Sequence, residues 1–392
     1  MAAERRTRIL IVDDSAVMRS LLRSVIVAEP GLEVAGTAGD GASALSSVGL
    51  LRPDLILLDV EMPVMDGLVT LRELRRRGHK MPVIMCSSVT QRGAKVTLEA
   101  LASGASDYVA KPAGQANREA AIKALGKDLG PKILALTHHL QPQQTSIFAP
   151  PAAHGMAQIQ PLLPSAARPP VFLPGGAPIK AQPISTQPTV VVIGVSTGGP
   201  AALELVLPKL PANFPLPVLI VQHMPELFTK LFAERLDSRC PLRVREAAEG
   251  DAAVAGTISI ARGNWHMEVQ APARPGPPPT LHLTQAPPEN HCRPAVDVLF
   301  RSAAAVYGQG VLAVVLTGMG SDGMLGCRTI REHGGAVLAQ DQASSTVWGM
   351  PGAVTNAGLA HKVVPLREIA SEILRLAQRT HNEARELRES VV

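Results

Sequence analysis

The sequence holds 392 residues with a formal net charge of +5, and 46% of them are hydrophobic and 3% aromatic. This length predicts two domains with packed cores, and no apolar run reaches the roughly 18 residues that a membrane-spanning helix needs. The low aromatic content, with no basic block longer than Arg75–Arg77, argues against a nucleic-acid-binding protein. The first residues lack the apolar core of a secretory signal, and the four cysteines have no paired spacing. We therefore expect a cytoplasmic protein with reduced thiols and no membrane insertion.

The first 125 residues alternate short apolar runs with helical patterns. The runs predict strands, which are Arg8–Val12, Leu32–Ala38, Leu55–Leu58, Pro82–Cys86 and Tyr108–Ala110. Helical periodicity follows each of them, at Ser15–Ala28, Asp40–Val48, Gly67–Arg77, Gly93–Ala102 and Asn117–Leu140. Five strands alternating with five helices predict a flavodoxin-like, doubly wound parallel sheet, and we assign residues 1–125 to this domain.

A proline-rich stretch separates this domain from the rest of the chain. Residues 141–188 contain 11 prolines in 48 positions, and only Arg168 and Lys180 carry a charge. Prolines at this density prevent a continuous helix and favour extended chain, so we predict an interdomain linker over residues 126–188.

The remaining chain has a second alternating pattern, which predicts a parallel-sheet α/β domain over residues 189–382 and a charged tail over 383–392. Its predicted strands are Val190–Ile193, Val218–Val221 and Val311–Leu316. Its predicted helices are Ala201–Lys209, Leu227–Leu236, Val296–Val306 and Met324–Glu332. Residues 242–284 have short strand-like pieces between proline and glycine breaks, for which we expect local hairpins.

Acidic residues gather at the predicted strand ends of the first domain. Asp13 and Asp14 follow the first strand, Asp59 ends the third, Ser87 follows the fourth and Lys111 the fifth. Because parallel strands end at one edge of a sheet, these side chains should meet there. Three carboxylates at one place favour Mg²⁺, which with Lys111 would neutralise a phosphoryl group on Asp59. Any one of these acids alone could simply cap the helix that follows it. The acid pair, the third acid, the hydroxyl and the lysine together favour the metal and phosphoryl site.

At these residues the sequence resembles the receiver domain of two-component response regulators, over about residues 7–125. The motifs are LIVDDS, LILLDVEMPVMDG, VIMCSS and DYVAKP. The resemblance implies phosphorylation by a histidine kinase. It also implies a role for each residue of the set, with Asp59 as acceptor, Asp13, Asp14, Asp59 and the Glu61 carbonyl as Mg²⁺ ligands, Ser87 and Lys111 as phosphoryl contacts, and Tyr108 as the aromatic switch.

Ser196 is the candidate nucleophile of the second domain. It lies in Gly194–Gly198, which fits the pattern G-x-S-x-G between a strand and a helix that begins near Pro200. A serine in such a turn presents its hydroxyl at the carboxyl edge of the sheet, where a helix N-terminus favours negative charge. The alternative is a glycine-rich turn that binds a phosphate or nothing.

His223 is the best-placed base for this serine, because it directly follows the strand Val218–Val221 at the same predicted edge. His266 and His291 are alternatives, either of which can be a surface or structural histidine.

Asp322 is the candidate partner that would orient the base, since it follows the strand Val311–Leu316. Asp341, after another strand-like run, is its rival, and Asp297 is expected to be a solvated or capping residue on a helix. The order serine, histidine, aspartate differs from that of α/β-hydrolases and predicts a different fold.

The second domain resembles the CheB family, the chemotaxis response regulator protein-glutamate methylesterases. The motifs are IGVSTGGP, VQHMPELFTKLFAERL, CRPAVDVLF and LTGMGSDG, with WGMP at residues 348–351. The resemblance implies Ser196, His223 and Asp322 as the catalytic triad, with Thr197 and Met319 lining the site or holding the oxyanion, and no cofactor there. Two positions depart from the family pattern, Val195 in place of alanine and Cys292 in place of histidine.

The implied activity is hydrolysis of γ-glutamyl methyl esters on methyl-accepting chemoreceptors, with deamidation of receptor glutamines by the same chemistry. Packing of the receiver domain over the catalytic cleft, released by a shift around Gly93–Asp107, is the expected control. The alternatives are another acyl hydrolase behind the receiver domain, a phosphorylation-gated scaffold with an inactive hydrolase fold, and a transcriptional regulator. The last would need a basic recognition helix, which the second domain lacks.

Overall fold

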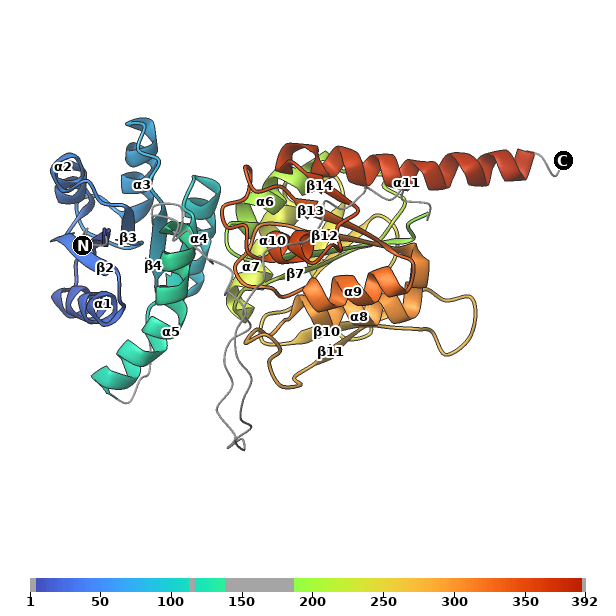
Figure 1. The fold of residues 1–392 in the computed structure, drawn as a ribbon, viewed down its shortest axis with the longest axis horizontal. Coiled ribbons are helices and arrows are strands. Elements are labelled where there is room, and N and C mark those ends of the chain that lie inside the picture. The colour runs from blue at the N-terminus through green and yellow to red at the C-terminus, as the bar shows by residue number, and fades with distance from the viewer. Residues whose placement is uncertain (1–4, 113–116, 138–186, 390–392) are drawn as a thin grey trace, which may run out of the picture.

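The computed structural model describes the backbone of residues 5–112, 117–137 and 187–389, with side chains to residue 377. The chain folds into two domains that lie against each other (Figure 1). Residues 138–186, which hold most of the predicted linker, lie outside the described residues. No helix in the described ranges is both long and apolar enough to cross a bilayer.

The N-terminal domain is a five-stranded parallel sheet in the order β2-β1-β3-β4-β5, which confirms the predicted doubly wound topology. Its strands are β1 (Thr7–Val12), β2 (Leu32–Ala38), β3 (Leu55–Asp59), β4 (Val83–Ser87) and β5 (Asp107–Ala110). Its helices are α1 (Ala16–Ala28), α2 (Gly41–Leu51), α3 (Gly67–Arg76), α4 (Gln91–Ala102) and α5 (Arg118–Thr137).

Alternate residues of the strands supply the two faces of this sheet. Ile9 and Ile11 pack in one apolar cluster with residues of α1 and α5. Leu10 and Val12 point the other way, into a cluster with residues of α2, α3 and α4. Both faces are covered, as a parallel sheet requires.

Helix α5 corrects the predicted start of the linker. It runs to Thr137, so residues 126–137, which the sequence placed in the linker, belong to the last helix of the first domain. Pro131 lies inside it, while Leu125, Leu129 and Ile133 are buried. Burial of these apolar residues outweighs the poor helix propensity of the Gly126 to Pro131 region.

The C-terminal domain is built on a seven-stranded sheet in the order β14-β13-β12-β6-β7-β9-β8, in which every pair is parallel. Its strands are β6 (Val190–Val195), β7 (Val218–Gln222), β8 (Arg243–Glu246), β9 (Thr257–Ile260), β12 (Val311–Val315), β13 (Ala336–Gln340) and β14 (Lys362–Val364). Its helices are α6 (Gly199–Val206), α7 (Glu226–Asp237), α8 (Val296–Tyr307), α9 (Met324–Glu332), α10 (Met350–Asn356) and α11 (Leu366–Glu389), with short 3₁₀ turns at Leu207–Lys209 and Gly308–Gly310.

Helices cover both faces of this second sheet (Figure 1). Val190 and Val192 of β6 pack in a cluster with α8, α9 and α10, and Val191 and Ile193 pack in another with α6, α7 and α11. Part of the predicted tail, 383–392, falls within the bounds of α11.

The region predicted as local hairpins holds one hairpin and one parallel pair. Strands β10 (His266–Gln270) and β11 (Thr280–Thr284) pair antiparallel, as expected. Strands β8 and β9 instead pair in parallel at the edge of the main sheet. The alternation of strand residues reports burial of one face but does not set the direction of pairing, which is why the sequence did not separate these cases.

The two domains meet through α4, β5 and α5 of the first domain. Helix α4 packs against α6 and α7 of the second. The ring of Tyr108 on β5 stacks on that of Phe228 on α7, with centroids 4.6 Å apart and planes 17° apart. One apolar cluster runs across this boundary, so the interface has a dry centre.

Gly67, at the start of α3, gives a test of the packing beneath Asp59. A Cβ placed there would lie 2.0 Å from the Asp59 carbonyl oxygen, which is backbone and cannot move aside. We expect Gly67→Ala to lower the free energy of unfolding of the first domain by about 2–3 kcal/mol. Native-state hydrogen exchange at the β3 amides would measure it.

Gly49, on the exposed side of α2, is the matched control, because a Cβ there meets open space. Gly49→Ala should stabilise the same amides by about 0.5–1 kcal/mol. Equal effects of the two substitutions would contradict the close approach at Gly67.

Candidate functional site

Ser196 lies in the turn between β6 and α6, and two glycines shape this turn. Gly198 has φ +78°, in the left-handed region that glycine adopts without strain. A Cβ at Gly199 would lie 2.0 Å from Oε1 of Gln222. The Nε2 group of Gln222 donates to the carbonyls of Ser196, at 3.1 Å, and His223, at 3.2 Å. The buried Gln222 amide thus joins the turn that carries Ser196 to the one that carries His223.

His223 and Asp322 reach this position from the two strands that flank β6. His223 follows β7 and Asp322 lies between β12 and α9, so both stand at the carboxyl edge of the sheet with Ser196. The Nε2 atom of His223 is 2.8 Å from Oδ2 of the buried Asp322. The structure therefore brings together the three residues that the sequence singled out.

The N-terminus of α8 holds Asp322 in place. Backbone N–H groups of Val296 and Asp297 donate to its two oxygens, at 2.7 and 3.0 Å. Burial would raise the pKa of Asp322, but His223 and these N–H groups outweigh burial and hold the pKa below its ordinary value. Asp322 is thus an anion whose orientation is set by backbone.

Ser196 and His223 line one cavity of about 1050 Å³ that also has walls from the first domain. Its lining on that side includes Asp107, Tyr108 and Lys132. Within the described residues, the Ser196 hydroxyl makes no hydrogen bond, so serine and histidine share the cavity without being joined. Loose apo geometry of this kind is common before substrate binds.

The backbone N–H groups of Thr197 and Met319 have no acceptor among the described residues, and both residues line the same cavity as Ser196. Thr197 is buried, and Met319 is half-buried against an apolar cluster that includes residues of the first domain. Free N–H groups next to a serine are what an oxyanion requires.

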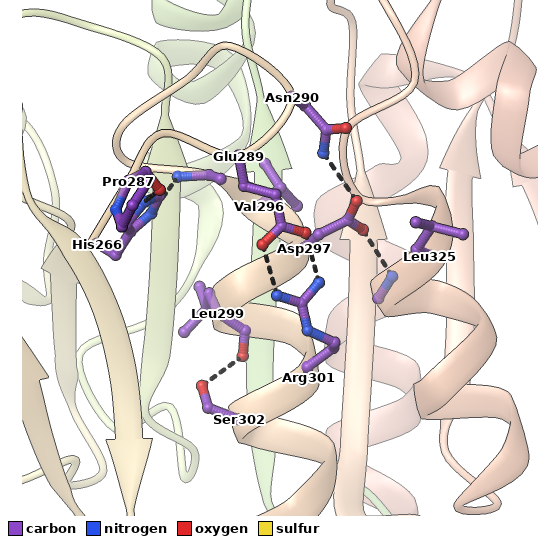
Figure 2. Close-up of polar contacts among 12 residues, drawn as sticks. His266, Pro287, Glu289, Asn290, Val296, Asp297, Leu299, Arg301, Ser302 and Leu325 are labelled. Atoms are coloured by element: carbon purple, nitrogen blue, oxygen red, sulfur yellow. Dashed lines mark hydrogen bonds and ion pairs between the residues drawn. The ribbon is translucent and has the colours of Figure 1, made fainter. Parts of the chain in front are cut away.

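The two alternatives to His223 as the base, His266 and His291, are found in different surroundings. His266 is buried, with Nδ1 accepting from the Ala295 N–H at 3.1 Å and Nε2 3.1 Å from the Pro287 carbonyl. Figure 2 shows the ring of His266 turned to Pro287. His291 lines the cavity and has a left-handed backbone, with φ 63°.

The alternatives to Asp322 are also separated by their contacts. Asp341 accepts from the Ser344 N–H at 3.1 Å and closes a local turn. Asp297, expected to be a solvated or capping residue, is instead 1% exposed, and its Oδ1 accepts from the Gly326 N–H at 2.6 Å. The sequence expectation was wrong here because Asp297 is buried by the packing of α9 on α8, a tertiary contact that leaves no periodic signal in the sequence.

The carboxylate edge of the first domain brings Asp13, Asp14 and Asp59 together, with one ligand atom of each within 4.8 Å of the others. Lys111 Nζ lies 2.8 Å from Asp13 Oδ2 and 2.7 Å from Asp59 Oδ1. Burial raises the pKa of Asp59, with the Asp13 charge adding to it, and Lys111 opposes the rise. Hard oxygen ligands in such a set fit Mg²⁺.

The remaining predicted residues of this edge surround Asp59. The Glu61 N–H points to Asp59 Oδ1 at 3.4 Å, which places its backbone at the site. Ser87 is fully buried at the end of β4, and its Oγ donates to the Ser88 carbonyl at 3.2 Å. Tyr108 is turned away from Asp59, onto Phe228 of the other domain.

Asp107 is a contact that the sequence did not predict. Its Oδ2 accepts from the Thr197 hydroxyl at 2.6 Å, a buried hydrogen bond that links β5 to the residue after Ser196. Lys132 of α5 donates to the Tyr108 carbonyl at 2.7 Å and lies 3.9 Å from Asp107. No sequence signal could have predicted the contact between Asp107 and Thr197, because the two residues come from different domains.

His223 gives a test of the pair with Asp322. Burial would lower the pKa of the imidazole, but hydrogen bonds to Asp322 and Cys292 raise it to about 10. Its stabilisation of the fold is therefore fully present below the ordinary pKa and is lost as pH rises towards 10. Asp322→Asn removes the negative charge that raises the pKa of His223, whereas burial still lowers it, so the imidazole should titrate at lower pH than in the parent. NMR of the histidine ring protons, with the His223 signal assigned from its loss in His223→Gln, would measure this titration in the parent and in Asp322→Asn. Equal titration of His223 in the two proteins would contradict its pairing with Asp322.

Comparison with known proteins identifies the family of each domain. The family described as CheB methylesterase matches residues 191–373, and the response regulator receiver domain matches residues 9–123. A protein-glutamate methylesterase/protein-glutamine glutaminase of Nocardioides sp. is 49% identical over 370 residues, covering 94% of each chain. The protein of that name from Trichodesmium erythraeum is 46% identical over 368 residues, covering 94% of this chain and 98% of its own.

Among solved structures, the CheB methylesterase catalytic domain of Thermotoga maritima is 41% identical, with a TM-score of 0.47, and covers 48% of this chain and 98% of its own. With the two family matches placed end to end and relatives aligned over nearly their whole length, the chain belongs to the CheB methylesterase family and has a response regulator receiver domain before its methylesterase domain.

Proposed function

We propose that this chain is a serine-type protein-glutamate methylesterase, controlled by phosphorylation of Asp59, that acts on methyl-accepting chemoreceptors in chemotactic adaptation. The convergence of Ser196, His223 and Asp322 on one cavity carries the proposal, with His223 and Asp322 2.8 Å apart. The names of relatives aligned over nearly their whole length support the substrate.

Acylation begins when Ser196 Oγ attacks the carbonyl carbon of a γ-glutamyl methyl ester and passes its proton to His223. Asp322 stabilises the imidazolium that forms. The N–H groups of Thr197 and Met319 donate to the oxyanion. When the tetrahedral intermediate collapses, the bond from carbon to the methoxy oxygen breaks, and His223 returns the proton so that methanol leaves.

Deacylation repeats these steps with water. His223 takes a proton from the water as its oxygen attacks the acyl carbon, and the Ser196 oxygen leaves with that proton, which frees the glutamate side chain. A glutamine side chain reacts in the same way, with ammonia in place of methanol. The second half of the relatives' name supports this deamidation.

The receiver domain blocks the catalytic cavity of the resting enzyme. Its β5 and α5 supply a wall of the cavity, which leaves no room for a receptor helix beside Ser196. Separation of the domains opens the cavity to substrate and to water.

Phosphorylation of Asp59 by a histidine kinase would release the interface through β4 and β5. Mg²⁺ supplies charge neutralisation when bound, and Asp13, Asp14, Asp59 and the Glu61 carbonyl would hold it. The phosphoryl group takes over the Lys111 contact and attracts Ser87. Because the Lys111 N–H donates to the Ser87 carbonyl at 2.8 Å, a shift of Ser87 moves β5 and with it Tyr108.

Methanol release from methylated receptor in membranes tests the activity. The parent should release methanol faster with a small phosphodonor and Mg²⁺, and Asp59→Asn should not respond. Ser196→Ala should lose at least a thousandfold in rate with or without donor, because no nucleophile remains. Ser238→Ala, at the exposed end of α7, and Asp40→Asn, which keeps the cap of α2, are the controls. Equal methanol release by Ser196→Ala and the parent would refute the proposal.

The hydrogen bond between Asp107 and Thr197 tests the closed state. Asp107→Ala removes a charged acceptor from a buried hydroxyl, and such a bond contributes about 1.5–3 kcal/mol. We expect methanol release without phosphodonor to rise roughly tenfold, with no change in the phosphorylated rate.

Asp128→Ala is the control for this substitution, because Asp128 pairs with Lys132 within α5, at 3.0 Å. It should leave the basal rate within twofold of the parent. A basal rate in Asp107→Ala that stays at the parent value would show that this contact does not hold the domains closed.

A further inference from the structure

Asn290 joins two buried carboxylates through one nitrogen atom. Its Nδ2 donates to Asp322 Oδ1 at 2.9 Å and to Asp297 Oδ2 at 2.9 Å. Figure 2 shows this amide aimed at Asp297. Since an amide NH₂ group has two donors, one for each carboxylate, both are used. The backbone N–H of Asp297 closes a ring by donating to Asp322 Oδ1 at 3.0 Å.

Asp297 is a fixed anchor for this bridge. It is 1% exposed, and its other oxygen accepts from the Gly326 N–H at 2.6 Å. A Cβ at Gly326 would lie 3.2 Å from that oxygen, so the glycine lets the backbone of α9 approach closely. Each Asp297 oxygen thus has one donor, and Asn290 supplies one of the two.

The bridge also separates two acidic groups that would otherwise repel each other. Burial raises the pKa of Asp297 to about 6, and the nearby charge of Asp322 adds to the rise, whereas Asn290 and Gly326 oppose it. Removing the amide would leave two close carboxylates facing each other, with only backbone donors between them.

The loop that presents Asn290 is shaped for this purpose. Asn290 and His291 both have left-handed backbone, with φ 52° and 63°. Glu289 and Cys292 exchange backbone hydrogen bonds of 3.1 and 2.8 Å around them. Both carboxylate oxygens of Glu289 pair with Arg301 of α8 at 2.7 Å, as Figure 2 shows. The exposed Asn290 is therefore held over the buried acids by a tied loop, and it covers their solvent side.

We propose that Asn290 is a positioning residue of the hydrolytic site, whose amide bridges Asp322 to Asp297 and so keeps the second oxygen of Asp322 directed at His223. The inference rests on the proposed hydrolase function. It concerns His223 only through Asp322, because within the described residues the amide donates to Asp322 and Asp297 and makes no hydrogen bond to the histidine or Ser196.

Two substitutions separate the amide from the backbone shape. Asn290→Gly keeps a left-handed backbone without strain but removes both donors, and we expect a roughly tenfold fall in kcat with KM within twofold of the parent. Asn290→Asp keeps size, shape and tolerance of this backbone but faces two carboxylates with a third, and we expect a larger fall, on the order of a hundredfold.

Glu289→Gln is the matched control. It replaces the ion pair with Arg301 by a neutral amide contact, while the backbone hydrogen bonds between Glu289 and Cys292 still hold the loop and the Asn290 donors are kept, so kcat should stay within threefold. All variants are assayed as the full chain with phosphodonor, after thermal unfolding has shown that they fold. A role in loop shape alone predicts parent-like kcat for Asn290→Gly and Asn290→Asp, and a fall of less than threefold in both would overturn the proposal.

The rate at which a fluorophosphonate probe labels Ser196 keeps this test apart from the receptor assay. Labelling forms a bond from Ser196 Oγ to phosphorus and expels fluoride, and it needs His223 and Asp322 but no receptor. Slower labelling of the Asn290 variants than of parent and control supports the bridge. Parent-like labelling overturns it. A parent that labels at Ser196 but releases no methanol would refute the proposed substrate instead.

Discussion

Parallel strands all end at the same edge of their sheet, and both functional sites of this chain depend on that constraint. The residues that follow β6, β7 and β12 meet because β6 lies between the other two. The same rule gathers the acids after β1 and β3 with Lys111 after β5. At neither site does the chain need a long excursion to bring distant residues together, since the hydrogen-bonded ladder fixes the spacing.

The proposed control by phosphorylation sets a second constraint on the domain interface, which must be stable when closed and still able to open. Its apolar centre, with Tyr108 stacked on Phe228, favours closure without specifying one register. The buried bond from Thr197 to Asp107 supplies a directional contact next to Ser196. Taking such an equilibrium from 99:1 closed to 99:1 open needs about 5.5 kcal/mol. Two or three hydrogen bonds worth about 1.5–3 kcal/mol each would supply this free energy. A much larger interface would hold the domains closed even after phosphorylation.

The sequence predicted the helices and strands that have a periodic apolar pattern, and the site residues that lie at the end of a strand. Asp59, Ser196, His223 and Asp322 were all placed by their position after an apolar run, and the structure brings the last three to one cavity. The end of the first domain was misplaced because the boundary at residue 125 was drawn inside the helix predicted over Asn117–Leu140, where Gly126 and Pro131 weaken the helical pattern and tertiary burial maintains it. The support given by Asn290 and the contact between Asp107 and Thr197 depend on loop dihedrals and on the packing of domains, neither of which has a local pattern in the chain.

The two departures from the CheB motifs differ in their consequence. Val195 is fully buried, and a Cβ at Gly199 would lie 2.6 Å from its Cγ2, so the larger side chain uses space that glycine leaves free. It changes packing under the turn and not the groups that face the cavity. Cys292 instead lines the cavity and hydrogen-bonds His223, where it adds to the rise in the imidazole pKa. Asp322 is the carboxylate partner of His223, so the orientation of the imidazole depends on the hydrogen bonds that hold Asp322.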